Sequence, residues 1–181
     1  MGIIKSAWEI ALERSESIVI DKDKLKKDEE IKQIRSILGR YLSDDDKLDI
    51  EKLKSFNKDI INEAVLIVLD QNLILPHDSL NEQRMEKINK IAWAVSTKEE
   101  FLSHTTNIIT FLRQYPNHKT HLIEQIKAQF KTMIEQKNPN ENIDLDNNPE
   151  FAQILKTQLE KLAANYIQTL EESKKQLAKL I

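Results

Sequence analysis

The chain has 181 residues, a formal net charge of −3, no cysteine and only two glycines. Without cysteine there can be no disulfide, zinc–thiolate site or thiol catalysis, and two glycines cannot build a Gly-rich phosphate loop. Positive and negative charges are mixed along the chain, so we expect no nucleic-acid partner. The longest wholly apolar run, 64–69, is too short to span a membrane. The expectation that follows is a soluble cytoplasmic protein without a cofactor.

Residues 1–27 are expected to hold a docking helix followed by a linker. The helix is predicted from about 4 to 15, because Ser6 and Glu9 are spaced as a capping box. One side of this helix is apolar and carries Ile4, Trp8, Ala11 and Leu12. The apolar triplet at 18–20 is either a short strand or an apolar segment within the linker, and we favour the second interpretation.

Two further helices are predicted at 28–42 and 50–71, each with apolar residues at steps of three and four. The run 64–69 is apolar on every side of its helix, and such a helix is buried. We therefore expect it at the centre of the core. The alternative for this region is a β-hairpin that pairs 65–69 with 73–75, although no glycine is available for its turn.

The middle of the chain predicts three more helices. Capping boxes favour helix starts at 79 and 97, with helices running to about 95 and 114. The Tyr-Pro-Asn sequence at 115–117 predicts a break, since proline inside a helix removes a hydrogen bond and clashes with the preceding turn. A helix at 118–137 is expected to follow the break.

The domain organisation follows from these elements. Residues 28–137 are expected to form the main helical bundle. Trp93 and Trp8 each lie on an apolar helix face, and we expect both to pack in the core, with Trp8 anchoring the N-terminal helix on the bundle. The segment 138–148 is rich in Asn and Asp and predicts a linker. Residues 149–181 follow it as a separate element.

The last segment predicts one long amphipathic helix of roughly 50 Å, with Asn148 as N-cap and Pro149 at its first position. Its apolar stripe consists of Phe151, Ile154, Leu155, Leu159, Leu162, Tyr166, Leu170, Leu177 and Leu180. A helix of this length exceeds a small domain, so part of the stripe needs a partner. The helix either packs along the bundle or projects from it as a coiled-coil arm.

Three histidines are the only residues whose pattern suggests metal ligands. His118 and His121 are three residues apart at a predicted helix start, so both can lie on one face. A third ligand could come from the preceding predicted helix, as either His104 or Glu100. The opposing interpretation is that these are polar side chains in contact with solvent, which we favour.

The stretch Ile4-Lys5-Ser6-Ala7-Trp8-Glu9-Ile10-Ala11-Leu12-Glu13-Arg14 resembles the opening of an uncharacterised bacterial family associated with spirochaetes. Members of that family open with a similar I-K-S-A-x-E-I-A-L-E stretch. The family has no assigned activity, so the resemblance implies a bacterial cytoplasmic protein and carries over no site residue.

Together these patterns predict an all-α fold of six or seven helices with a long C-terminal amphipathic helix. Because the apolar stripe is long and no catalytic residues are evident, we expect a non-catalytic interaction module: an adaptor, an assembly factor or a chaperone-like protein. Its protein partner, or a second copy, would bind Leu155, Leu159, Leu162, Tyr166, Leu170 and Leu177. The alternative is a helical-bundle metal protein or enzyme that uses the histidines.

Overall fold

The computed structural model describes residues 22–43, 47–137, 144–145 and 147–181. The predicted helix at 4–15 and the triplet at 18–20 lie outside the described residues. Within them the chain forms helices and no strand, which confirms the all-α prediction. The helices are α2 (Lys22–Ser43), α3 (Ile50–Lys54), α4 (Lys58–Asn72), α5 (Glu82–Val95), α6 (Glu99–Lys137) and α7 (Pro149–Leu180).

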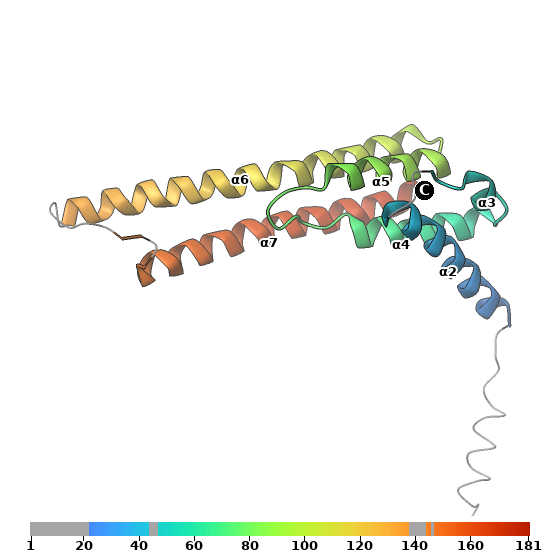
Figure 1. The fold of residues 1–181 in the computed structure, drawn as a ribbon, viewed down its shortest axis with the longest axis horizontal. Helices are drawn as coiled ribbons and strands as arrows, with labels where there is room; N and C mark the ends of the chain where they lie inside the picture. The colour runs from blue at the N-terminus through green and yellow to red at the C-terminus, as the bar shows by residue number, and fades with distance from the viewer. Residues whose placement is uncertain (1–21, 44–46, 138–143, 146) are drawn as a thin grey trace, which may run out of the picture.

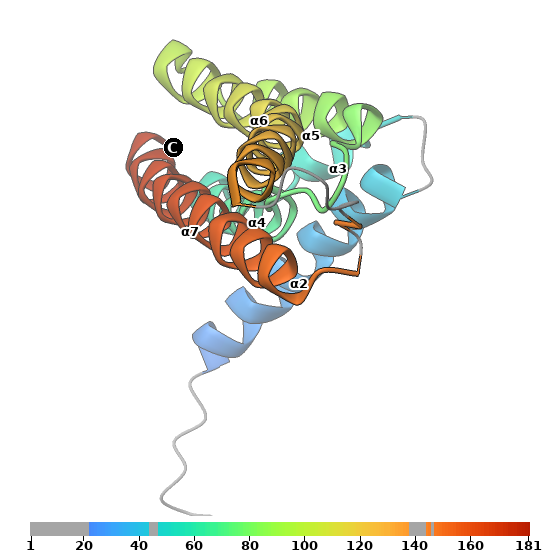
Figure 2. The same ribbon diagram turned by 90° about the vertical axis from the view of Figure 1, so that its left-hand side faces the viewer.

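The molecule has a wide half and a narrow half. Two long helices, α6 and α7, run side by side in opposite directions along its whole length (Figure 1). The shorter helices α2, α3, α4 and α5 gather around one end of this pair, so that end is wide (Figure 2). The other end of the pair projects alone and forms the narrow half. This asymmetry decides which apolar residues find neighbours within the chain.

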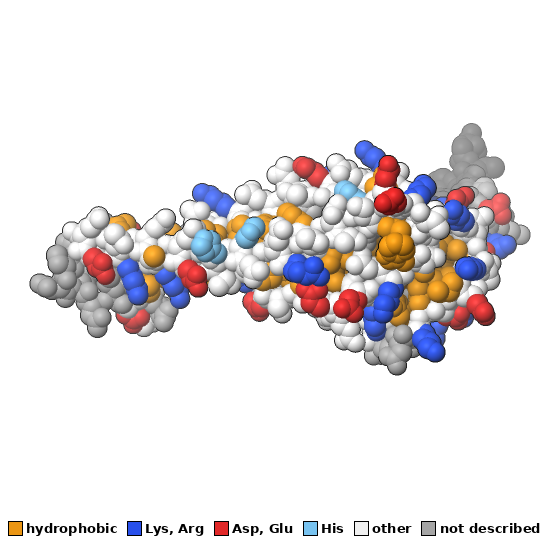
Figure 3. All heavy atoms as spheres, turned by 90° about the horizontal axis from the view of Figure 1, so that it is seen from above, with side chains coloured by type: hydrophobic (Ala, Val, Ile, Leu, Met, Phe, Trp, Pro, Cys, Tyr) orange, Lys and Arg blue, Asp and Glu red, His pale blue; other side chains and the backbone are white. Residues whose placement is uncertain are grey.

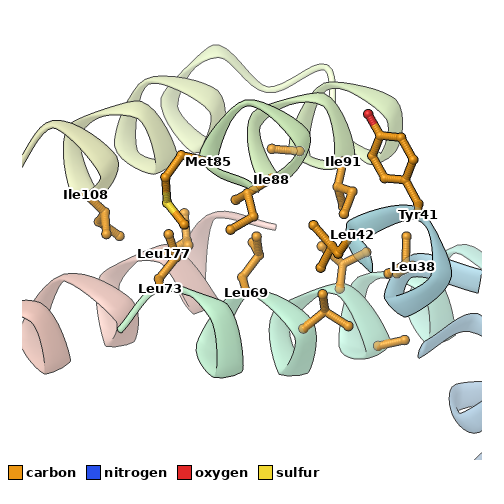
Figure 4. Packing of buried hydrophobic residues seen from close by; sticks show 14 of the residues in the cluster. Leu38, Tyr41, Leu42, Leu69, Leu73, Met85, Ile88, Ile91, Ile108 and Leu177 are labelled. Carbon is orange, nitrogen blue, oxygen red and sulfur yellow. The ribbon is translucent and has the colours of Figure 1, made fainter. Parts of the chain in front are cut away.

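One buried cluster fills the wide half. Side chains from α2, α4, α5, α6 and α7 meet in it and point toward one another (Figure 4). Its fully buried members include Ile34, Leu38, Val65, Leu69, Ile88, Ile91, Phe101, Ile109, Leu112 and Leu177. Burying a side chain of this size contributes about 1.5–3 kcal/mol to folding. The cluster also includes Leu53 of α3, so it holds all six described helices together in one core.

The predicted helix at 50–71 is wrong in one respect, because the chain breaks at 55–57 into α3 and α4. The Asn57 side chain accepts a hydrogen bond from the Asp59 backbone N–H (2.8 Å) and starts α4 as its N-cap. Ser55 donates its hydroxyl to the carbonyl of Lys52 (2.7 Å) and ends α3. The β-hairpin alternative is also wrong, because 65–69 lies inside α4.

The predicted break at 115–117 is wrong, because α6 continues through Pro116. Proline at an interior position costs about 3 kcal/mol, so tertiary contacts must compensate. The ring of Tyr166 on α7 stacks on Phe111, before the proline, with centroids 4.5 Å apart. The hydroxyl of the same tyrosine is hydrogen-bonded to His118, after the proline, at 2.6 Å. One side chain thus holds both sides of the proline in one helix.

The predicted start of the last helix is confirmed. The side chain of Asn148 accepts a hydrogen bond from the Phe151 backbone N–H (3.0 Å), and Pro149 occupies the first turn. Proline fits there because the first N–H groups of a helix have no partner within it. The helix ends at Leu180, which agrees with the long C-terminal helix that the sequence predicts.

Ion pairs on the surface of the wide half tie neighbouring helices together. Arg113 on α6 donates two hydrogen bonds of 2.7 Å to the carboxylate of Glu82 on α5, and this guanidinium lowers the pKa of Glu82 below 4.5. Lys174 on α7 lies 3.1 Å from a carboxylate oxygen of Asp70 on α4. Exposed pairs of this kind contribute little to stability, so the core, not these bridges, holds the fold.

Candidate interaction surface

The structure places the three histidines in separate contacts. Nε2 of His104 lies 2.9 Å from the carbonyl oxygen of Ser173, and Nδ1 of His118 lies 2.6 Å from the hydroxyl of Tyr166. His121 instead contacts Gln125, one turn further along α6, at 3.0 Å. In the part of the chain that the structure describes, no three His, Cys, Asp or Glu residues group as metal ligands.

Tyr166 is the centre of an aromatic cluster halfway along the α6–α7 pair. Its ring stacks on Phe111 and meets the edge of Tyr115, with centroids 5.0 Å apart. Burial raises the pKa of the Tyr166 hydroxyl above 10.0, and the neighbouring Tyr115 adds to the shift. Tyr166 is 7% exposed. This residue of the predicted partner-binding stripe therefore packs within the chain.

The remaining stripe residues divide by position along α7. Leu170 and Leu177 are 3% and 2% exposed and belong to the main core. Leu155, Leu159 and Leu162 lie nearer the start of α7 and are only half-buried. The second half of α7 is thus part of the core, whereas the first half, apart from the buried Phe151, leaves its apolar stripe residues partly exposed.

The narrow half, which we call the distal hairpin, consists of residues 117–137 of α6 and 149–165 of α7. Its only buried side chains, among those described, are Ile126, Phe130 and Phe151. The rings of Phe130 and Phe151 meet with centroids 5.4 Å apart. Around them lie half-buried apolar side chains, namely Leu122, Met133, Ile134, Leu145, Ile154 and Leu155. Two helices bury only the seam between them, so this apolar surface is left partly open.

An apolar groove runs along one side of the distal hairpin. We call it the distal groove; its volume is about 340 Å³. Its lining residues are Leu122, Gln125, Ile126, Gln129, Phe130, Met133, Ile154 and Gln158. None of these eight side chains is charged, although 31% of the chain is charged and about two charges would be expected among eight residues. Depletion of charge is typical of the centre of a protein interface.

A second groove, of the same volume, lies between α4 and α7 on the wide half and differs in chemistry. Six of its ten lining residues are apolar, Leu66 and Ile67 among them. Four charged residues also line it: Asp70, Glu171, Lys174 and Lys175. Lys174 bridges it by donating to the carbonyl oxygen of Asp70 (2.9 Å). Lys174 is thus already engaged by contacts within the chain, whereas the distal groove has no charged side chain in its lining.

The α6 side of the distal groove was not predicted from the sequence. The predicted helix at 118–137, which carries Leu122 and Met133, was assigned to the bundle because a helix break was predicted at 115–117. The signal that could have revealed it is helix length. Without the break at 115–117, one long helix precedes a short linker and a second long helix follows it. Such a pair exceeds the bundle and must project from it.

The predicted burial of Trp93 is wrong, since its side chain is 68% exposed. Each residue turns a helix by about 100°, so the position after the buried Ala92 already points away from the core. Trp8 lies outside the described residues. Figure 3 shows hydrophobic side chains at several places along the narrow half and a larger hydrophobic area over the wide half.

None of the described helices has the length and apolar character needed to cross a bilayer. A family model described as a family of unknown function, DUF6657, matches residues 47–179, from just before α3 to the end of α7. No curated protein and no solved structure matches the chain. Because the family match covers well over half of its residues, the chain belongs to DUF6657, a family of unknown function.

Proposed function

We propose that this protein is a non-catalytic protein–protein interaction module, an adaptor, assembly factor or chaperone-like protein, whose partner binds the distal hairpin. One observation carries the proposal. The distal hairpin holds an apolar seam in only two helices and leaves an uncharged groove of about 340 Å³ on its side. A third helix, or a second pair of helices, is what such a seam needs to become a closed bundle.

The contrast between the two halves of the molecule supports this proposal. In the wide half, the short helices cover the α6–α7 pair and make its apolar residues the core. In the narrow half, the pair has fewer described neighbours. Leu145 of the linker packs on its apolar residues, and Lys119 near the base of the distal hairpin contacts His77 and Asp78. The same pair of helices thus has neighbours at one end and needs them at the other. Partly open apolar surface with a polar rim is typical of protein interaction sites.

The proposed contact surface is smaller than the stripe that the sequence suggests. It includes Leu155, Leu159 and Leu162, which are half-buried on the distal hairpin. Tyr166 and Leu170 pack inside the chain. A projecting hairpin that is anchored by its own core suits an adaptor, because the anchored end keeps the free end in a fixed orientation.

Two further expectations belong to this proposal. One is a bacterial origin, which the resemblance of residues 4–14 to a bacterial family implies. The other is a location in the cytoplasm, where we expect the partner to be found. The family match spans 47–179 and does not include the stretch that carries that resemblance.

The test is capture of partners from a native lysate with the wild-type chain and with Ile154→Lys. Ile154 lines the distal groove and is half-buried, so a lysine there places a charge in the groove while its stem can still reach solvent. We expect the variant to keep its helical circular dichroism and to lose the partner, whether that partner is another protein or a second copy.

The matched control is Ala164→Lys. Ala164 is exposed on the same helix and does not line the groove, so it adds the same charge elsewhere. A partner retained by Ala164→Lys and lost by Ile154→Lys supports the proposed function. Identical partner sets for the wild type and both variants would contradict it.

A further inference from the structure

The geometry points to a second copy of this chain as the occupant of the distal groove. This inference rests on the proposed function and names its partner. Two distal hairpins that meet groove to groove would complete a four-helix bundle, in which each hairpin supplies the layer that the other lacks. The half-buried residues Leu122, Met133 and Ile154 would form the centre of that bundle.

The side chains that line the distal groove can pack against the same side chains of a second copy. In a two-fold dimer the same patch faces its own copy, so a patch whose charges are all of one sign would meet like charges. The distal groove contains no charged side chain, and three of its eight lining residues are glutamines: Gln125, Gln129 and Gln158. A glutamine amide both donates and accepts hydrogen bonds, so it can pair with the same amide of a second copy.

The same chemistry disfavours a charged partner. An acidic or basic helix laid in the groove would bury charges without a counter-charge, and uncompensated burial of charge is costly. The groove on the wide half, with Asp70, Glu171, Lys174 and Lys175 in its lining, offers a charged partner counter-charges that the distal groove lacks. The distal groove therefore selects an uncharged apolar face, and the chain itself carries one.

Size and shape also fit a second copy. The exposed face of the distal hairpin is roughly 30 Å long and about two helices, or 20 Å, wide. It offers roughly 600 Å² per copy, near the ~800 Å² per partner of a standard interface. Because the distal hairpin projects beyond the other helices (Figure 1), two copies can meet along it with their wide halves at opposite ends.

The experiment uses variants of the full-length chain that carry two like charges in the groove. One variant carries Gln129→Glu and Gln158→Glu, and the other carries Gln129→Lys and Gln158→Lys. These side chains come from α6 and α7, and all three residue types are good helix formers. Sedimentation equilibrium at low ionic strength, up to about 100 μM, covers the micromolar affinities of weak standard-size interfaces.

We expect the wild type to dimerise and each variant to dimerise at least about tenfold more weakly, because like charges then face each other. Mixing the two variants should restore the dimer, since a glutamate groove then faces a lysine groove. The matched controls, Gln153→Glu and Gln153→Lys, alter an exposed glutamine of α7 outside the groove. They should dimerise like the wild type.

A wild-type chain that stays monomeric over this range would overturn the inference, as would a dimer that neither charge pair weakens. These results are distinguishable from failure of the proposed function. If the chain is monomeric but Ile154→Lys loses a captured protein, the interaction module stands and its occupant is another protein. If the chain is monomeric and all captured sets are identical, both proposals fail.

Discussion

At the scale of single residues, Tyr166 is the side chain that contacts α6 on both sides of Pro116. Its ring contacts Phe111 on one side of Pro116, and its hydroxyl bonds to His118 on the other. A hydrogen bond of this kind contributes about 1 kcal/mol, whereas truncating a buried aromatic ring costs about 3–5 kcal/mol. Most of the effect of this residue therefore comes from its ring.

This division predicts different results for two substitutions. Tyr166→Phe keeps the ring and should lower the free energy of unfolding by about 1 kcal/mol. Tyr166→Ala removes the ring and should lower it by about 4 kcal/mol, with some loss of helicity near Pro116. Chemical denaturation followed by circular dichroism measures both. Equal losses for the two variants would mean that the hydroxyl, not the ring, joins the helices.

Because two tyrosines are buried, we expect the free energy of unfolding to fall at alkaline pH. Burial raises the pKa of both Tyr41 and Tyr166 above the ordinary value of 10.0. A group whose pKa is raised by folding stabilises the fold fully below its unfolded pKa, and this contribution is lost as the pH rises through the folded pKa. The free energy of unfolding should therefore decline above pH 10.0.

The check is the slope of that decline in Tyr166→Phe. Phenylalanine does not titrate, so the variant should lose less stability than the wild type as the pH rises past this point. Parallel curves for the two proteins would show that deprotonation of Tyr166 is not coupled to unfolding.

At the scale of helices, local signals predicted most of the fold. The Asn148–Pro149 pair marked the start of α7 correctly, because capping depends on neighbouring residues alone. The break at 55–57 was missed, since the apolar spacing runs on through it and only the capping preference of Asn57 interrupts the helix. The break predicted at Pro116 was wrong, because contacts with a residue 50 positions away override a local penalty.

The continuity of α6 makes a prediction about that proline. In an unbroken helix, Pro116→Ala supplies the missing N–H and removes the clash with the preceding turn, so it should raise the free energy of unfolding by about 1–3 kcal/mol. Thermal and chemical denaturation measure the change. A loss of stability would indicate that the chain bends at this position and needs proline there.

The two halves of α7 should respond differently to the same substitution. Leu170 is 3% exposed in the main core, so Leu170→Asp buries an unpaired carboxylate and should cost more than about 4 kcal/mol. Leu162 is half-buried on the distal hairpin, so Leu162→Asp can reach water and should cost less than half as much. Denaturation curves of the two variants compare them directly. Equal costs would mean that α7 is equally buried along its length.

At the scale of the whole molecule, the sequence predicted that the last helix has more apolar surface than it needs, but not where that surface remains. Tyr166, Leu170 and Leu177 pack inside the chain, whereas Leu155, Leu159 and Leu162 are half-buried in the narrow half. Periodicity shows which residues share the apolar face of a helix. Only the positions of the other helices show whether that face is covered. The α6 side of the distal groove was hidden for the same reason.

The most direct test of the distal hairpin as a contact surface uses the absence of cysteine from the chain. Gln129→Cys in the groove and Gln153→Cys outside it each create a single thiol that can carry a photo-crosslinker. The account predicts that, in native lysate, the Gln129 probe links to protein and the Gln153 probe does not, with mass spectrometry telling a second copy from another protein. Equal labelling from both positions, or none from Gln129, would contradict it.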